Sequence, residues 1–540
     1  HTVTRRQRQM CIRDRSHRLN NIGLINRDKV ITFNFNGKSY QGYEGDTLAS
    51  ALLANGVHLV GRSFKYHRPR GFIGAGVDEP NAKLQVTING HSEPNINATE
   101  IELVDGLSAT SQNCWPSVEF DIGAINNFLK RFFPAGFYYK TFMWPKSFWY
   151  KVYEPFIRKA AGLGVASLEK DKERYEHKFE YCDLLVTGSG PSGLASAYAA
   201  AKNGAKVILA EDKPRYGGTL LTDDVSIDNM SGKDWSEKII SELKTMPNVT
   251  LKNRSQVFGY YDHNMMVMFE RVGDHLSNKS KYTPRQRLWY IRAKETILST
   301  GSIERPIVFG NNDTPGVVLS SAAKEYMKVY GVLVGRKPII FTNNDSAYET
   351  AFEFKKNNVE PIILDTREEH DSEVVQEAKN KGIQIKFSYG VIVANGYKKV
   401  KSAKIGKLTK DKKSFESTET INCDCICVSG FWTPTVHLAS QSGNKLKFDE
   451  KIDAFIPDKS KQNEKTIGAA NGSFTLQETI ESGFKTGSEL SSKITDKNNE
   501  NKIPTVTETK YSVHDKFWCM PLPKNENPKR FVDFQNDVAV

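Results

Sequence analysis

A glycine-rich turn lies between two apolar segments of the chain, residues 184–187 and 207–210. Gly188 permits a tight turn, Gly190 lets the backbone approach a pyrophosphate, and Gly193 lets the following helix pack closely on the strand. The start of that helix adds free N–H groups and the positive end of the helix dipole. The order of strand, glycines, helix and strand therefore predicts a bound dinucleotide rather than a turn with only a structural role.

An acidic residue, Glu211, directly follows the second apolar segment. At the end of this strand a carboxylate can accept hydrogen bonds from a ribose 2′-OH and repel a 2′-phosphate. The same glycine pattern also binds FAD, so a self-sufficient reductase that uses FAD and NAD(P)H is an alternative function.

The chain offers no convincing catalytic constellation beside this turn. It has no Cys-x2-Cys or Cys-x4-Cys pair, which argues against disulfide reductase chemistry. Cys423, Cys425 and Cys427 alternate along one predicted strand and are interpreted as small apolar residues rather than metal ligands. His437 is interpreted as a structural histidine. We therefore predict neither catalytic residues nor a metal site in this chain.

The composition indicates a soluble protein of several domains. The 540 residues are 39% hydrophobic and 26% charged, and no apolar run reaches membrane-spanning length. No signal peptide is evident, and seven irregularly spaced cysteines favour a reducing compartment, so we expect a cytoplasmic protein without a membrane partner. The net charge of +12 is spread over lysine-rich loops and the N-terminal arginines, which favours solvated charge over nucleic-acid binding.

The first predicted domain has the pattern of a ferredoxin-like β-grasp fold. Alternating strands flank an Asn-Gly turn at 36–37, and a short helix is predicted at 46–56. Further strands are predicted at 83–88 and 100–104. Such domains often hold a [2Fe–2S] cluster through a Cys-x4-Cys-x2-Cys loop, but the loop at 61–76 has no cysteine, so a cluster-free domain is predicted. The basic residues of this loop are expected to contact a phosphate or an acidic partner, or to be solvated: Arg62, Lys65, His67, Arg68 and Arg70.

A second strand–turn–helix–strand pattern begins at residue 338. Its turn carries Asn343, Asn344 and Asp345 where the backbone would have to approach a pyrophosphate. We therefore predict a scaffold domain without its own nucleotide.

The predicted fold class is α/β, with two nested Rossmann-like dinucleotide-binding domains of the glutathione reductase type after the cluster-free β-grasp domain. An aromatic-rich segment broken by prolines connects them and is expected to pack along another domain or subunit. The predicted boundaries are 1–20 for a non-native or disordered tail, 28–110 for the β-grasp domain, 111–178 for the aromatic-rich segment, 179–302 with 430–490 for the first Rossmann domain, 303–429 for the second, and 491–540 for a linker and the start of a further domain.

Several segments resemble the alpha subunit of heterotetrameric sarcosine oxidase. They are Gly61–Gly71, Gly136–Pro145, Glu154–Gly164, Gly217–Leu221, Thr342–Tyr348 and Phe531–Val538, within a resemblance that covers residues 28–540. The resemblance implies a complex with beta, gamma and delta subunits that oxidatively demethylates sarcosine to glycine, yields hydrogen peroxide and passes the one-carbon unit to tetrahydrofolate. It also implies NAD in the first Rossmann domain of this chain, with FAD and covalent FMN chiefly on the beta subunit.

The same resemblance implies which residues would hold NAD. They are Gly188, Gly190, Ser192 and Gly193 at the phosphates, Glu211, Asp212 and Lys213 around the adenosine ribose, Gly218 and Thr219 at the Gly-Gly turn, Val257 beside the adenine, and Ala470 and Leu476 on the far side.

One departure from this family concerns the C-terminus. Members of the family continue into a folate-binding, aminomethyltransferase-like domain, whereas this chain stops at Val540, so we expect a truncated N-terminal portion that is inactive alone. A subunit of a related amino-acid dehydrogenase and an assembly scaffold that binds nothing are further alternatives.

Overall fold

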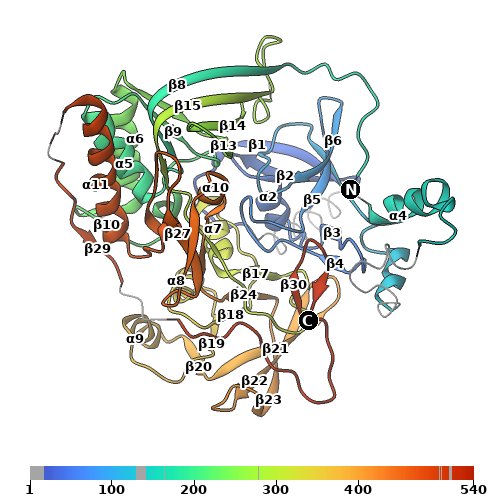
Figure 1. Cartoon of the computed structure of the whole chain (residues 1–540). Coiled ribbons are helices and arrows are strands. Elements are labelled where there is room, and N and C mark those ends of the chain that lie inside the picture. The colour runs from blue at the N-terminus through green and yellow to red at the C-terminus, as the bar shows by residue number, and fades with distance from the viewer. Residues whose placement is uncertain are drawn as a thin grey trace, which may run out of the picture. The chain divides into compact units, whose positions relative to one another are not determined.

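The computed structural model describes residues 17–128, 142–162, 164–277, 279–497, 499, 501–509 and 514–540 (Figure 1). The chain divides into two compact units. Unit 1 contains residues 1–171, 306–430 and 515–540, and unit 2 contains residues 172–305 and 431–514. Within the described residues, no helix is long and apolar enough to cross a membrane.

The N-terminal part of unit 1 is a five-stranded sheet with the strand order β2-β1-β7-β5-β6. Its elements are β1 (Asn26–Phe35), β2 (Lys38–Glu44), α2 (Leu48–Ala54), β3 (Gly61–Arg62), β4 (Pro69–Arg70), β5 (Lys83–Ile88), β6 (His91–Asn97) and β7 (Ser108–Ser111). The Thr47 side chain caps α2, and every residue of this helix is buried. The strand predicted at 100–104 is wrong: Glu102 makes an isolated bridge to Thr47, and β7 takes the place beside β1 and β5.

The aromatic-rich segment contains three short helical elements within the described residues. They are η1 (Ile122–Asn127), η3 (Trp149–Tyr153) and α4 (Glu154–Ala161). Pro155 lies in the first turn of α4, where its missing N–H costs nothing. Residues 129–141, which carry part of the predicted aromatic stretch, lie outside the described residues.

The rest of unit 1 contains a parallel sheet with the order β17-β24-β18-β19-β20. Its elements are β17 (Val317–Leu319), α7 (Ser320–Tyr330), β18 (Pro338–Thr342), α8 (Tyr348–Lys356), β19 (Ile362–Asp365), α9 (Glu373–Asn380), β20 (Gln384–Phe387) and β24 (Cys425–Ser429), joined by an antiparallel sheet of β21 (Tyr389–Gly396), β22 (Val400–Leu408) and β23 (Phe415–Asn422). All five residues of β18 and of β24 are buried, as expected for strands covered on both faces. Cys425 and Cys427 are therefore core residues, as predicted.

Unit 2 is built on a larger sheet with the order β12-β9-β8-β15-β14-β13, to which β28 is added beside β15. Its strands are β8 (Tyr175–Thr187), β9 (Val207–Ala210), β12 (Val249–Lys252), β13 (Ser255–Tyr261), β14 (Met265–Arg271), β15 (Gln286–Leu298) and β28 (Glu464–Thr466), and its main helices are α5 (Pro191–Lys202), α6 (Gly232–Thr245) and α11 (Leu476–Thr495). Neighbouring residues at the end of β8 enter different cores: Leu184 and Val186 pack with α5, α6 and α11, whereas Leu185 between them packs with β13–β15. Figure 1 shows the three helices on one side of this sheet.

Shorter elements complete unit 2. They are η4 (Gly218–Leu221), β10 (Ser226–Ile227), β11 (Met230–Ser231), β16 (Ser302–Glu304), β25 (Trp432–Pro434), α10 (His437–Gln441), β26 (Lys445–Asp449), β27 (Ala454–Lys459), η5 (Gly468–Asn471) and β29 (Val506–Thr507). Helix α11 packs very closely on α5, because a Cβ atom at Gly483 or Gly487 would lie 2.5 or 2.3 Å from a backbone oxygen of α5.

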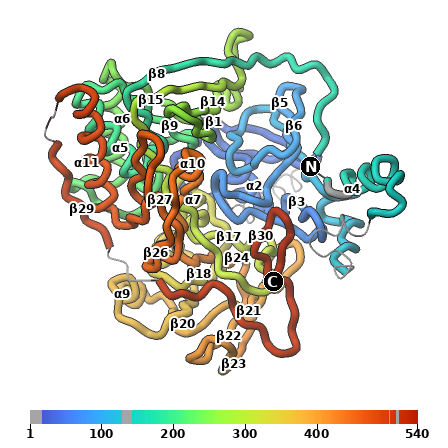
Figure 2. Tube along the Cα trace, in the orientation of Figure 1, coloured from blue at the N-terminus to red at the C-terminus, as the bar shows by residue number. Residues whose placement is uncertain are grey.

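Parts of two segments that the sequence assigns to a tail and a linker belong to the fold. Within the predicted tail, Arg18 donates to both oxygens of the buried Asp46 at 3.0 and 2.7 Å, while residues 1–16 lie outside the described residues. At the other end, Met520 and Phe531 are fully buried in unit 1, where β30 (Phe531–Asp533) pairs with β31 (Val538–Ala539). Figure 2 shows this C-terminal hairpin, in red, close to β3.

Candidate nucleotide-binding site

The turn between β8 and α5 has the geometry that its three glycines predict. Gly188 has a φ of +93°, and a Cβ atom there would lie 2.3 Å from the carbonyl oxygen of Ser299. A Cβ atom at Gly193 would lie 1.9 Å from the carbonyl oxygen of Gly188, so only glycine lets the helix approach the strand this closely. A Cβ atom at Gly190 would meet nothing within 4 Å. The space in front of Gly190 is therefore open to a ligand, as a pyrophosphate site requires.

The first turn of α5 faces this space with unused donors. Gly190 is the N-cap and Pro191 follows it at the first helical position. The amides of Ser192 and Gly193 belong to the first turn, which has no preceding helical carbonyls to bind, and they add to the positive end of the helix dipole. These groups fit a diphosphate of a dinucleotide.

Glu211 is bound to the glycine turn itself. One of its carboxylate oxygens accepts hydrogen bonds from the backbone N–H of Ser189 at 2.8 Å and from the Ser189 hydroxyl at 2.5 Å, and the other accepts from the Lys213 N–H at 3.0 Å. Burial raises the pKa of Glu211 to about 8, and the adjacent carboxyl of Asp212 adds to this rise. Glu211 therefore holds the turn in shape as well as lying where the ribose is expected.

The second group of predicted residues also lies against the turn. A Cβ atom at Gly218 would lie 2.9 Å from the Cα atom of Gly190, and the preceding Gly217 N–H donates to the Ser189 carbonyl at 3.1 Å. Thr219 follows in η4 and is exposed. Gly218 and Thr219 are thus brought next to the open space.

Two of the remaining predicted residues, Ala470 and Leu476, are buried near the helix that follows the turn, and the third, Val257, is half-buried on β13. Ala470 lies in η5, which touches α5 because a Cβ atom at Gly468 would lie 2.6 Å from the Ser192 hydroxyl. Leu476 begins α11 and belongs to the core that covers α5. Val257 lies on β13 and packs on the core that contains Ala210, the last residue of β9. Ala470 and Leu476 can therefore reach a ligand mainly through their backbone.

Sequence reasoning missed two serines that shape the turn. Ser189 joins the turn to Glu211, as described above. Ser299, just after β15, donates its hydroxyl to the carbonyl oxygens of Thr187 and Gly188 at 2.7 and 2.9 Å. Ser299 stands 106 or more positions away from the glycines it contacts, so no local pattern identifies it.

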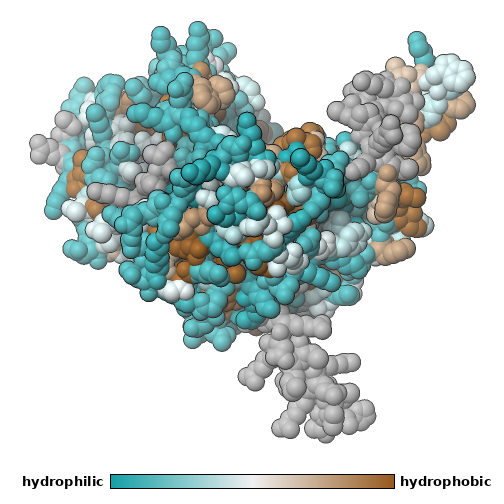
Figure 3. All heavy atoms as spheres, turned by 90° about the horizontal axis from the view of Figure 1, so that it is seen from below, coloured by the Kyte–Doolittle hydropathy of each residue, from teal (hydrophilic) through white to brown (hydrophobic). Residues whose placement is uncertain are grey.

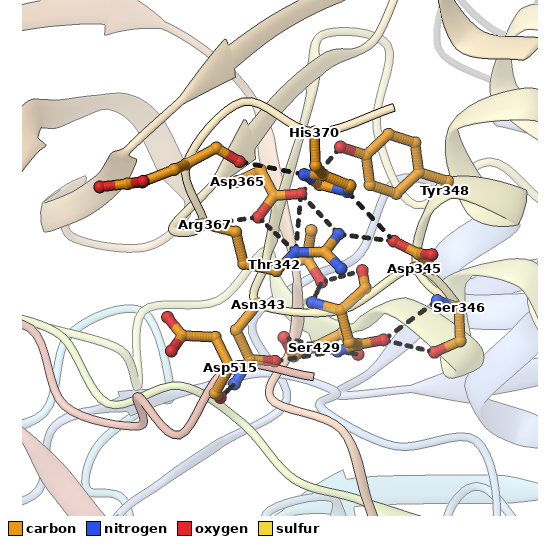
Figure 4. A network of polar contacts seen from close by, with 12 residues as sticks. Thr342, Asn343, Asp345, Ser346, Tyr348, Asp365, Arg367, His370, Ser429 and Asp515 are labelled. Atoms are coloured by element: carbon orange, nitrogen blue, oxygen red, sulfur yellow. Dashed lines mark hydrogen bonds and ion pairs between the residues drawn. The ribbon is translucent and has the colours of Figure 1, made fainter. Parts of the chain in front are cut away.

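The corresponding turn after β18 in unit 1 has protein partners instead (Figure 4). The Asn343 amide group donates to the carbonyl oxygens of Asp515 and Phe517 at 2.8 and 3.1 Å, and the Asn343 carbonyl accepts from the Asp515 N–H at 3.0 Å. Asn344 donates to the Ser429 hydroxyl at 3.1 Å. The turn thus binds the chain's own C-terminal segment.

Asp365, at the end of β19, occupies the place that Glu211 has after β9. It accepts from the Tyr348 hydroxyl at 2.8 Å and from Arg367 at 2.7 Å, and Arg367 also pairs with Asp345 at 2.7 Å (Figure 4). Asp345, Tyr348 and Asp365 are essentially inaccessible to solvent. A second nucleotide would have to displace these internal contacts, which supports the prediction of a scaffold domain.

The basic loop at 61–76 is mostly internal, so its interpretation as a surface for a phosphate or an acidic partner is wrong for four of its five basic residues. Arg68 pairs with Asp313 at 2.7 Å, and Arg70 pairs with Asp313 at 2.9 Å and also with Asp537. His67 pairs with Asp121 at 2.7 Å, and Arg62 donates to the Val118 carbonyl. The acidic partners lie within the same unit of the same chain.

The next part of this loop is organised by one carboxylate. Glu79 is 2% exposed and accepts four backbone hydrogen bonds, from Ile73, Gly74, Asn81 and Ala82, at 2.6 to 3.1 Å. Within residues 28–114 the sequence has one cysteine, Cys114. No group of three or more metal-ligating side chains occurs in the described part of the chain.

Two family models match parts of the chain. Residues 28–114 match the model described as 2Fe-2S iron-sulfur cluster binding domain, and residues 183–264 match the model described as FAD dependent oxidoreductase. The second match covers the glycine turn, Glu211 and Val257.

Known proteins resemble the chain over most of its length. It is 41% identical to a sarcosine oxidase subunit alpha from Rhizobium meliloti over 97% of this chain and 52% of the relative, and 32% identical to one from Corynebacterium sp. (strain U-96) over 86% and 43%. The solved L-proline dehydrogenase from P. horikoshii has the same fold, with a TM-score of 0.58 and 20% identity over 88% of this chain and 76% of that chain. The chain spans about half the length of the curated relatives it matches. It is thus similar, along nearly all of its own length, to sarcosine oxidase alpha subunits, and it combines a Rossmann-type oxidoreductase fold with an N-terminal domain of the 2Fe-2S-binding type.

Proposed function

We propose that the chain is the NAD-binding alpha subunit of a sarcosine oxidase, an oxidoreductase that acts as a complex of several subunits. The reaction of the complex is the oxidative demethylation of sarcosine to glycine with release of hydrogen peroxide and transfer of the one-carbon unit to tetrahydrofolate. The observation that carries this proposal is the open space at Gly190, framed by the start of α5, in a chain 41% identical to such a subunit. We assign this activity to the assembled complex and expect the chain alone to be inactive.

The roles of the chain's residues follow from the geometry of the turn. The amides of Ser192 and Gly193 bind the pyrophosphate, because they are first-turn donors at the positive end of α5. Glu211 orients the adenosine ribose, because its carboxyl oxygens can accept hydrogen bonds from the ribose hydroxyl groups. When bound, NAD supplies a hydride acceptor. Asp212, Lys213, Gly218, Thr219, Val257, Ala470 and Leu476 complete the proposed pocket.

FAD in the same turn is the second candidate, because residues 183–264 match an FAD dependent oxidoreductase model. In that case the chain itself would be yellow and would oxidise NADH as a self-sufficient reductase. Under the leading proposal, FAD and covalent FMN belong mainly to the beta subunit. Denaturing the purified chain and identifying the released small molecule by mass spectrometry separates the two: NAD supports the proposal, and FAD replaces it.

We propose that the N-terminal domain carries no iron–sulfur cluster, although it matches a cluster-binding model. Such clusters need several cysteine thiolates, and residues 28–114 contain Cys114 alone. The Glu79 carboxylate accepts hydrogen bonds from the backbone N–H groups of Ile73 and Gly74, which lie in the cysteine-free loop. Iron and acid-labile sulfide should both be absent from purified protein, and two of each per chain would contradict this part of the proposal.

Exposed aromatic residues support the proposal of partner subunits. Trp144, Tyr150 and Phe156 are 83%, 82% and 70% exposed, and in the preceding stretch Trp115 and Phe128 are 68% and 84% exposed. Apolar side chains also gather at the right-hand end of the face in Figure 3. Several large exposed aromatic side chains within one segment of the chain are typical of protein interfaces. We assign this surface to contact with the beta, gamma or delta subunit.

The test of the function is reconstitution. The chain is co-expressed with beta, gamma and delta subunits from the same genome, and sarcosine-dependent hydrogen peroxide release is measured with N-methyl-L-alanine and L-proline as alternative substrates. Activity confined to sarcosine supports the proposal. Preference for another amine would assign the chain to a related amino-acid dehydrogenase, and a complex that binds no nucleotide would leave the scaffold alternative.

A further inference from the structure

A cavity of about 240 Å³ lies within unit 1, apart from the nucleotide site proposed in unit 2. Its wall comes from the β1–β2 hairpin, from residues 56–59 after α2, and from the turn between β21 and β22. These parts are distant in sequence and belong to the β-grasp domain and to the antiparallel sheet that follows it. The proposed function assigns no role to this cavity.

The charges around the cavity are mostly positive. Lys38, Lys398 and Lys399 contribute ammonium groups to its wall, and Glu119 contributes the one carboxylate, which leaves a net charge of +2. Within the described residues, none of the three lysines forms an ion pair. Three ammonium groups around one opening create a positive potential that attracts small anions.

The inner wall adds hydrogen-bonding and apolar groups. His58 is 5% exposed, and its Nε2 atom has no hydrogen-bond partner within the described residues. Burial lowers the pKa of His58 well below its ordinary value, and the positive charges of the nearby Lys399 and His17 lower it further. The imidazole is therefore neutral at pH 7. Phe35, Val57 and the half-buried Tyr40 supply apolar and aromatic surface.

We propose that this cavity binds a small organic anion with carboxylate or phosphate groups and an apolar body. The lysines at the opening recognise the charge, and the apolar wall recognises the body, which is the usual division of roles in a small-molecule site. The volume of about 240 Å³ is below the range of about 300–1,000 Å³ that drug-sized ligands occupy. The ligand is therefore smaller than a dinucleotide and distinct from the NAD proposed in unit 2.

Isothermal titration calorimetry of the intact chain tests this inference with four defined probes. Phenyl phosphate and phthalate combine negative charge with an aromatic body, inorganic phosphate has the charge alone, and benzamide has the body alone. We expect one molecule of phenyl phosphate or phthalate to bind per chain, roughly tenfold more tightly than inorganic phosphate or benzamide. The stronger of the two aromatic anions identifies whether the natural ligand carries phosphate or carboxylate.

Three variants, one of them a control, locate the binding. Lys399→Met removes one ammonium group from the opening and should weaken the aromatic anions roughly tenfold. Lys401→Met is the matched control, because Lys401 is an exposed lysine on the same hairpin that does not line the cavity, and it should leave binding unchanged. Val57→Phe narrows the cavity without changing its charge and should abolish binding of phenyl phosphate.

Three results would overturn the inference. They are absence of binding at millimolar concentrations of both aromatic anions, equal affinity for phenyl phosphate and inorganic phosphate, and equal loss in the Lys399 and Lys401 variants. Thermal unfolding shows whether each variant is folded. If Lys399→Met does not fold, loss of phenyl phosphate binding in Val57→Phe tests the inference by itself.

Discussion

Arg70 and Asp537 form a buried ion pair between residues 467 positions apart in the sequence, and their side chains are 1% and 0% exposed. Asp537 also accepts the backbone N–H groups of Lys65 and Tyr66 at 2.8 and 3.0 Å. The second carboxylate around Arg70 is Asp313, at 2.9 Å. The C-terminal hairpin and the β-grasp loop are thus joined through charges that water does not reach.

Asp537→Ala should destabilise unit 1 by about 3–5 kcal/mol, because it leaves the Arg70 guanidinium buried with one carboxylate fewer. Chemical denaturation followed by tryptophan fluorescence measures the change in free energy of unfolding. Asp533→Ala is the control, because the same hairpin carries Asp533 on its outer part, bonded to Asn536. A similar decrease in the free energy of unfolding in both variants would mean that the buried ion pair stabilises the protein no more than the exposed contact does.

Glu211 should make stability depend on pH. Its pKa is about 8 in the folded protein against 4.5 as its ordinary value, so the folded state keeps a proton that the unfolded chain loses. The stabilisation from this group is complete below pH 4.5 and is lost as the pH rises through 8. Glu211→Gln should therefore flatten the fall in melting temperature between pH 5 and pH 9. The exposed Glu237→Gln serves as the control, and equal slopes for wild type and Glu211→Gln would contradict the prediction.

Substitution by alanine should lower NAD affinity at Gly190 and fold stability at Gly193. Gly190→Ala meets no protein atom within 4 Å, so the melting temperature should be unchanged while NAD affinity falls about tenfold or more. Gly193→Ala forces a methyl group to within 1.9 Å of the Gly188 carbonyl and should destabilise the fold by about 1–3 kcal/mol. Calorimetric titration and thermal unfolding measure the two effects. Unchanged NAD affinity in Gly190→Ala would show that NAD does not bind at this turn.

Asn343 should hold the C-terminal segment in place. Asn343→Leu removes two hydrogen bonds to the backbone at Asp515 and Phe517 and should cost about 1–3 kcal/mol. Hydrogen exchange followed by mass spectrometry should show faster exchange in residues 514–520 than in β12 or β9. Uniform change across both units would instead indicate general destabilisation.

Trp144→Ser and Phe156→Ser should change assembly without changing the fold. Both side chains are at least 70% exposed, so the melting temperature of the chain alone should stay the same. If the aromatic surface contacts another subunit, the double variant should co-purify with markedly less beta, gamma or delta subunit. The exposed Tyr282→Ser in unit 2 is the matched control, and full assembly of the double variant would rule out this surface as the interface.

The local patterns of the sequence predicted the elements around the glycine turn well. β8, α5 and β9 follow from apolar runs, glycine spacing and an alanine-rich helix, all of which act between residues close in sequence. The β-grasp hairpin and α2 followed in the same way. The position of β7 did not, because the partner of a strand is chosen by tertiary packing and residues 100–104 have the same apolar character.

The basic loop shows why the remaining errors occurred. Its arginines resemble an anion-binding surface when only the neighbouring residues are considered. Their counter-charges, Asp313 and Asp537, lie 243 or more positions away, and no alternation or spacing links them to the loop. The same limit applies to Glu211, whose raised pKa comes from burial that the sequence does not display.

The interleaved course of the chain has a consequence for biosynthesis. Arg70 is made early on the ribosome, but Asp537, one of its two carboxylate partners, is made 467 residues later. The segments of unit 2, by contrast, are complete once residue 514 has emerged. Unit 2 can therefore finish folding first, whereas the Arg70 guanidinium lacks one of its two carboxylate partners until Asp537 has emerged.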